Sequence, residues 1–140
     1  LMLALLSIGI PTIRSSAAAA PSSVSAAGGP QAGQLTLSWD YDFTPPRIAA
    51  CGTTVNNCIY EFRVARRAGG VEVAVSTVPV PTNAAGMANF AVPVGAPVLG
   101  ALSFTVQALA RDGAGLIVPG AVASVDYVVR PDAPQNLRVQ

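Results

Sequence analysis

The most regular hydrophobic pattern of the chain covers residues 34–41. Leu35, Leu37, Trp39 and Tyr41 alternate there with polar residues, which is the period of a strand with one buried face. Trp39 is the single tryptophan of a chain in which only 6% of the residues are aromatic. We therefore expect its ring to fill the middle of the core. Such a strand needs a second apolar layer against it, which predicts a packed β-protein.

Similar alternating runs follow along the chain, with segments rich in Gly, Pro and Asn between them. No stretch has a helical period. Besides the Trp39 strand, the expected strands cover residues 22–26, 58–67, 71–75, 87–92, 102–110 and 121–129. The turn Ala68-Gly69-Gly70 predicts a hairpin between the runs on either side of it. Seven short strands with turns between them predict an all-β fold, a seven-stranded antiparallel β-sandwich.

Large apolar side chains recur on one face of these predicted strands. In the run over residues 58–67, Tyr60, Phe62 and Val64 share one face and Glu61 and Arg63 share the other. This alternation predicts that the large side chains pack between the two sheets. The residues expected in the core are Trp39, Tyr60, Phe62, Phe104, Val106 and Val125.

The composition is apolar and nearly neutral. Apolar residues make up 51% and charged residues 11% of the 140 residues, which excludes a solvated disordered chain. The net charge is +1, and the basic side chains are all arginines. Arg63, Arg66 and Arg67 form the one local basic cluster, which we interpret as a solvated strand face. A nucleic-acid-binding protein carries a concentrated basic stripe, so no nucleic-acid partner is expected.

The first twenty residues have the pattern of a secretory signal peptide that is cut short at its start. Residues 1–10 are apolar and uncharged, and a tract of Ser and Ala follows at 15–20. Ten apolar residues are too few to cross a hydrocarbon core of about 30 Å, so no membrane span is expected in the mature chain. A buried strand is the alternative. We expect a leader over residues 1–20 and a secreted or cell-surface protein.

Export gives a role to the two cysteines. Cys51 and Cys58 bracket a short segment rich in turn-forming residues, and in an oxidising compartment they are expected to pair. Zinc binding is the rival interpretation. It lacks support because the chain has no histidine and only two thiols, which is short of a tetrahedral site.

Three segments of the chain, residues 35–39 around Trp39, residues 60–64 and residues 104–115, match strands of a known family in the right order. They are similar to the second strand of the fibronectin type III domain with its core tryptophan, to its third strand, and to its sixth strand with the following loop. Residues 21–130 therefore resemble this domain, which implies an immunoglobulin-like β-sandwich. Family members usually have a tyrosine where Phe104 stands, and the tyrosine hydroxyl ties down the neighbouring corner. Phe104 cannot make that hydrogen bond, so we expect this corner to be either looser or held in another way. The segment between Tyr41 and Cys58 is longer than in the family, so the predicted disulfide is a local addition.

Residues 131–140 resemble the proline-led opening of a second domain of the same kind. This resemblance implies a repeat and a chain with further domains. The alternative is a disordered tail.

Few residues are suited to catalysis. Without His or Lys the commonest general bases and amine nucleophiles are missing, so no enzyme activity and no cofactor are expected. Asp40, Asp42 and Asp112 carry oxygens of the kind that calcium prefers. We interpret them as solvated loop carboxylates and expect no metal site.

The resulting functional hypothesis is a non-catalytic extracellular module, a spacer or cell-adhesion unit of a tandem-domain protein. The alternative is an accessory module of an extracellular polysaccharide-degrading enzyme. Expected partners are adjacent domains of the same chain and an extracellular protein or glycan. Because binding residues concentrate on loops held by a rigid scaffold, the candidate binding residues lie in the loops expected at one end: Phe43, Arg47, Asn56, Asn57 and Asp112.

Overall fold

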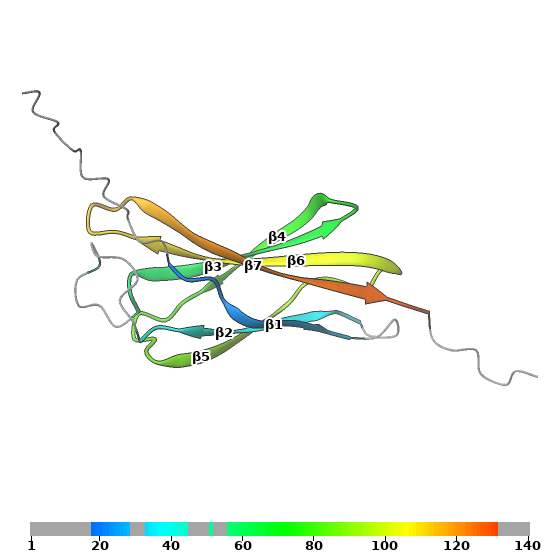
Figure 1. The fold of residues 1–140 in the computed structure, drawn as a ribbon, viewed down its shortest axis with the longest axis horizontal. Coiled ribbons are helices and arrows are strands. Elements are labelled where there is room, and N and C mark those ends of the chain that lie inside the picture. Colours follow the sequence, from blue (N-terminus) through cyan, green and yellow to red (C-terminus); the bar gives the residue numbers. More distant parts are fainter. Residues whose placement is uncertain (1–17, 29–32, 45–50, 52–55, 132–140) are drawn as a thin grey trace, which may run out of the picture.

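A computed structural model of the chain describes residues 18–28, 33–44, 51 and 56–131, which form two antiparallel sheets (Figure 1). One sheet has the order β1-β2-β5 and the other the order β4-β3-β6-β7. The expectation of an all-β fold with antiparallel sheets is confirmed for these residues. The strands are β1 (Ser22–Ala27), β2 (Thr36–Asp42), β3 (Ile59–Ala68), β4 (Val71–Pro79), β5 (Met87–Pro93), β6 (Gly100–Arg111) and β7 (Ile117–Val129).

The two sheets enclose one apolar core between them. Along β2 and β6 every second side chain is buried, as the period of two predicts. The Trp39 ring meets Phe62 of the other sheet edge-on at 5.3 Å and stacks on Phe90 of its own sheet at 5.9 Å. Trp39, Phe62, Phe104 and Val106 are each 1% exposed or less. The central tryptophan therefore joins the sheets.

Two side chains that were expected in the core occupy other positions. The pairing of β3 with β6 is irregular between Ile59 and Glu61, and this bulge places Ile59 in the core. Tyr60 is left half-buried, with the Arg111 guanidinium 5.1 Å from its ring centre. Assigning Tyr60 to the core was wrong, because a bulge shifts the alternation by one residue. Val125 is half-buried and packs against the core from β7.

The three clustered arginines do not share a strand face. Arg63 lies on the outer face of β3, where its guanidinium is 3.0 Å from the Glu72 carboxylate. Arg66 is paired with Phe104 of β6, and Phe104 is fully buried. Directly paired residues point to the same side of a sheet, so Arg66 points inward. The interpretation of a single solvated basic face was therefore wrong for Arg66.

The strand β7 begins four residues before the predicted start. It accommodates Pro119 because it is an edge strand and because its pairing with β6 is irregular at that point. The next residue, Gly120, packs against Ala18, whose carbonyl accepts a hydrogen bond from the Ala121 amide at 3.0 Å. A side chain at Gly120 would lie 2.9 Å from that carbonyl oxygen. Ala18 falls within the predicted leader, yet it contributes to the core.

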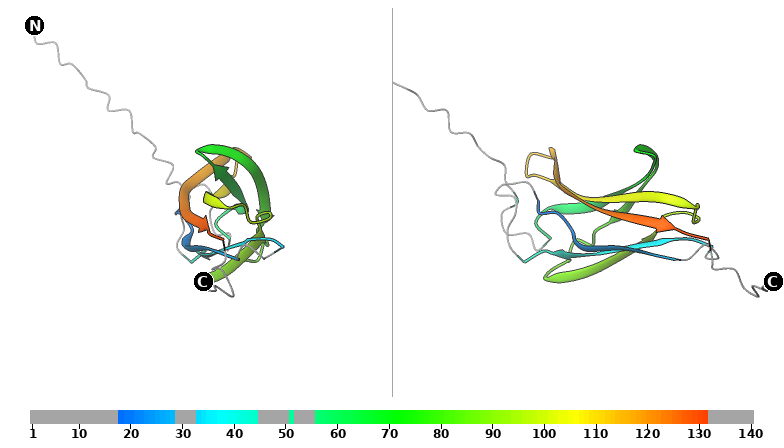
Figure 2. Two further views of the ribbon diagram at one scale, coloured as in Figure 1. Left: turned by 90° about the vertical axis from the view of Figure 1, so that its right-hand side faces the viewer. Right: turned by 45° about the vertical axis from the view of Figure 1, so that its right-hand side comes forward.

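The described chain enters and leaves the sandwich at opposite ends. Figures 1 and 2 show the segment that leads into β1 at one end of the long axis and the end of β7 at the other. Near the exit, the Tyr127 hydroxyl of β7 donates a hydrogen bond to the Gly28 carbonyl after β1. This bond ties the two sheets together, so a tyrosine on β7 secures that edge of the sandwich.

Candidate functional site

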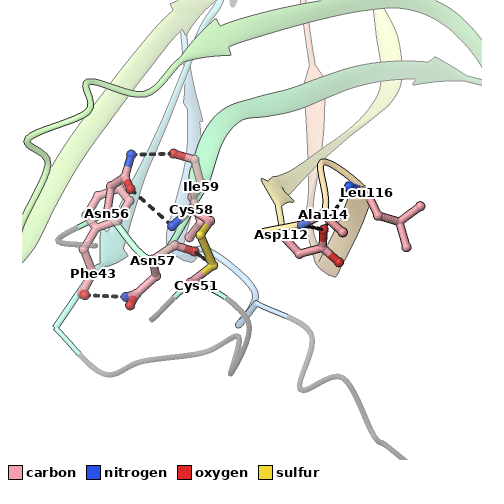
Figure 3. The surroundings of a disulfide bond; sticks show 9 residues. All are labelled: Phe43, Cys51, Asn56, Asn57, Cys58, Ile59, Asp112, Ala114 and Leu116. Atoms are coloured by element: carbon pink, nitrogen blue, oxygen red, sulfur yellow. Dashed lines mark hydrogen bonds between the residues drawn. A yellow bond between two sulfur atoms is a disulfide. The ribbon is translucent and has the colours of Figure 1, made fainter. Parts of the chain in front are cut away.

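The two loops expected at one end of the sandwich do lie together (Figure 3). We call this region the loop end, and it comprises residues 42–44, 51, 56–58 and 111–116. Cys51 and Cys58 form a disulfide whose Cα atoms are 5.5 Å apart. The Arg111 amide donates a hydrogen bond to the Cys58 carbonyl at 3.0 Å. This bond connects the disulfide segment to the loop between β6 and β7.

Phe43 is a core residue and offers no binding surface. It continues the alternation of β2 and is 1% exposed. Its ring lies 4.9 Å from Tyr41 and 6.1 Å from Phe90, and its amide donates to the Gly86 carbonyl at 2.9 Å. Phe43 thus anchors the start of the long loop, and its assignment to a binding surface was wrong.

The two asparagines beside the disulfide hold the backbone of their own segment. Asn56 accepts a hydrogen bond from the Cys58 amide at 3.2 Å and donates one to the Ile59 carbonyl at 3.0 Å. Asn57 is 5% exposed, and its side-chain amide donates to the Phe43 carbonyl. The positive φ of 53° at Asn57 is a backbone conformation that asparagine tolerates better than most residues. Both side chains are therefore engaged in loop structure.

Asp112 holds the neighbouring loop in the same way. One of its carboxylate oxygens accepts hydrogen bonds from the Ala114 and Leu116 amides, both at 2.9 Å. This arrangement is the self-capping turn that aspartate commonly forms. Arg47, the remaining candidate, lies outside the described residues.

The three aspartates that were weighed as calcium ligands are also engaged locally. Asp42 accepts a hydrogen bond from the Thr44 amide and Asp40 one from the Asn89 side chain, both at 2.9 Å. Among the described residues no group of three or more His, Cys, Asp or Glu side chains is placed to hold a metal ion. These carboxylates therefore act as caps and cross-strand partners.

Beside the loop end lies a small surface that the strand pattern did not reveal. Leu116 and Ile117 are 66% and 48% exposed there, and the exposed Arg111 places its guanidinium 5.1 Å from the ring centre of the half-buried Tyr60. The tyrosine and the arginine come from different strands, β3 and β6. Their proximity depends on the bulge at Ile59, which no local sequence signal marks.

Elsewhere on the molecule, aromatic side chains are turned away from solvent. Every tryptophan, tyrosine and phenylalanine of the chain lies in the described part, and each is buried or half-buried. Interfaces draw much of their binding energy from Trp, Tyr and Arg side chains. Among the described residues, arginine is the one of these three types with exposed members, and Tyr60 is half-buried beside Arg111.

A groove of about 450 Å³ opens between β4 and the end of β5. Its walls are mostly apolar, with Val64 and Leu102 among them, and Arg66 projects into it. The Arg66 guanidinium donates a hydrogen bond to the Val94 carbonyl at 2.8 Å. None of the described residues that line the groove is acidic. This groove lies on the other side of the sandwich from the β1–β7 contact.

No protein-family model matches the sequence, and no curated protein is significantly similar to it. Within the part of the chain that the structure describes, no helix is long and apolar enough to cross a membrane.

Proposed function

We propose that residues 18–131 form a fibronectin type III-type module that acts as a non-catalytic structural unit in an exported protein with several domains. The observation that carries this proposal is the placement of the chain ends. The chain enters near the loop end and leaves at the opposite end of the long axis (Figure 2). Modules with this geometry join in series, so each one adds its length to the distance between its neighbours.

The sheet arrangement supports the assignment to this family. A three-stranded sheet of the first, second and fifth strands faces a four-stranded sheet of the others. The single tryptophan lies on the second strand, where the resemblance expects it. Phe104 stands in place of the usual tyrosine and is fully buried. The hydroxyl of Tyr127 supplies a different tie between the sheets.

Export is supported by the disulfide together with the apolar leader predicted from the sequence. Disulfides persist mainly in oxidising compartments. Cys51 is 7% exposed and belongs to the core cluster. The disulfide therefore fixes the base of the long loop to the sandwich and suits a module that must resist proteolysis outside the cell.

The loop end supports a structural role over adhesion. Four of the five candidate binding residues are described, and each of the four supports its own loop or the core. Aromatic side chains commonly stack on sugars, and here each of them is buried or half-buried. No observation on the described residues favours the accessory role in a polysaccharide-degrading enzyme, in which this module would in any case serve as a spacer.

The test measures the separation of the flanking domains in the exported full-length protein, with one fluorophore on each. Deleting residues 18–131 is expected to bring the fluorophores closer, and inserting an unrelated sandwich of equal end-to-end length is expected to restore the distance. An unchanged distance after deletion would contradict the proposal. So would a replacement that folds without restoring the distance.

A further inference from the structure

The groove between the two sheets is bordered by the free edge of a strand. β4 pairs only with β3 among the described strands, and its residues 73–76 line the groove. Successive side chains of a strand point to opposite faces. Four consecutive residues can therefore line one groove only where the strand presents its edge. That edge offers backbone donors and acceptors with no strand beside them.

The groove also contains a charge that has no counter-charge among the described residues. Arg66 is half-buried, and among the described residues its only hydrogen-bond acceptor is the Val94 carbonyl. The one ion pair found in the described part joins Arg63 to Glu72, on the outer face of β3. A guanidinium has five N–H donors and binds a carboxylate best through two of them. Arg66 thus keeps most of its binding capacity in a largely apolar setting.

The chain leaves room for this arginine to lie across the groove. Gly95 has a φ of +93°, and a side chain there would lie 2.6 Å from the Arg66 Nη1 atom. Any larger residue would displace the guanidinium from the Val94 carbonyl. The position of Arg66 therefore depends on a glycine in the opposite wall.

We infer that this groove binds an extended peptide segment, which adds to β4 as a further strand and places an acidic side chain on Arg66. Strand addition to an exposed edge obtains its affinity from main-chain hydrogen bonds and its specificity from pockets for alternate side chains. The free edge of β4 supplies the main-chain hydrogen-bonding groups, and the groove supplies the pocket for alternate side chains. Val64, Val98 and Leu102 suit small apolar side chains on either side of the acid. The site is separate from the loop end and goes beyond the spacer role.

The free edge of β4 and the Arg66 guanidinium together favour a peptide over a small anion as the ligand. A free carboxylate would use Arg66 alone and leave the edge of β4 unpaired. A peptide uses both, and its volume requirement is modest because only alternate side chains enter. The cavity volume of about 450 Å³ lies within the range of roughly 300–1,000 Å³ found for ligand sites.

The probe is a heptapeptide, Thr-Val-Thr-Glu-Thr-Val-Thr, titrated into the isotope-labelled 140-residue chain and followed by NMR. Saturable shifts are expected at the backbone amides of residues 73–76 and at the side-chain Nε–H of Arg66. Replacing the central glutamate of the peptide by glutamine is expected to weaken binding about tenfold or more, because a hydrogen bond between charged groups is lost.

Two N-methylated peptides test the strand geometry. Amides of a strand point alternately to its two edges. Methylation of every odd residue or of every even residue therefore blocks one edge only, and one of the two peptides is expected to lose binding while the other retains it. Octanoate, which carries a carboxylate but no peptide backbone, is expected to bind much more weakly.

Variants of the protein provide the matched control. Arg66→Met keeps the apolar stem and removes the charge, and it is expected to lower affinity about tenfold or more. Arg67→Met alters the exposed neighbour on the outer face and is expected to leave affinity unchanged. The inference is overturned if no shift occurs at millimolar peptide, if the glutamine peptide binds equally well, if both methylated peptides bind, or if octanoate matches the peptide. None of these results depends on the spacing of flanking domains.

Discussion

At the loop end, Asn56, Asn57 and Asp112 direct their side chains to backbone groups of their own or adjoining loops. In the groove between β4 and β5, Arg66 makes one hydrogen bond to the described residues and forms no ion pair with any carboxylate among them. The loop end has the residue types typical of binding sites, and the groove has a single charged side chain. Unused hydrogen-bonding capacity therefore marks a candidate site better than residue type does.

The largest expected effect concerns the core that both regions share. Trp39→Ala removes the ring that contacts Phe62 and Phe90, and the cavity is expected to lower the free energy of unfolding by about 3–5 kcal/mol. Trp39→Phe is the control. The indole nitrogen is buried without a hydrogen-bond partner in the described residues, so this change costs packing alone and is expected to be much milder. Urea denaturation measures both, and an alanine variant whose free energy of unfolding equals that of the parent would reject the assignment.

Removal of the disulfide is expected to affect the loop end and the groove differently. Replacing Cys51 and Cys58 with alanine is expected to cost about 2.5 kcal/mol, from the chain-entropy estimate for a loop of this length. Amide hydrogen exchange should accelerate at the loop end and remain unchanged at residues 73–76. Equal acceleration in both regions would show that the disulfide supports the whole sandwich. Two free thiols in protein made in an oxidising compartment would contradict the pairing itself.

A smaller effect is expected within the β6–β7 loop. Asp112→Ala removes the acceptor for the Ala114 and Leu116 amides and is expected to cost about 0.5–1.5 kcal/mol. Asp126→Ala is the matched control, because that aspartate is exposed on β7 with no hydrogen bond to its side chain among the described residues. Its cost is expected within about 0.5 kcal/mol. Equal costs in thermal denaturation would mean that Asp112 does not cap the loop.

Much of the fold follows from alternation alone. The period of two located the strand around Trp39 and the long β6, and Gly69-Gly70 marked the hairpin between β3 and β4. The same period places Phe43 on the face of Trp39 and Arg66 on the face of Phe62. Both inward positions were therefore present in the sequence. They were missed because Phe43 was assigned to a loop and Arg66 was grouped with the neighbouring arginines.

Other features could not be predicted from the sequence. The bulge at Ile59 depends on how β3 pairs with β6, and it decides that Tyr60 meets Arg111 outside the core. The groove depends on the separation of two strands, β4 and β5, that belong to different sheets. Such long-range geometry leaves no local pattern, so the site it creates becomes visible only in the folded chain.

The contrast between the two regions is tested most directly by comparing Asn57→Ala with Arg66→Met in one urea denaturation series. Asn57→Ala leaves a buried carbonyl of Phe43 without its donor and is expected to lower the free energy of unfolding by about 1–3 kcal/mol. Arg66→Met loses one hydrogen bond but also removes a half-buried charge, so its cost is expected within about 0.5 kcal/mol. A larger loss in the free energy of unfolding for Arg66→Met than for Asn57→Ala would contradict the account. Arg66 would then be the residue that stabilises the fold, and the unused hydrogen-bonding capacity would lie at the loop end.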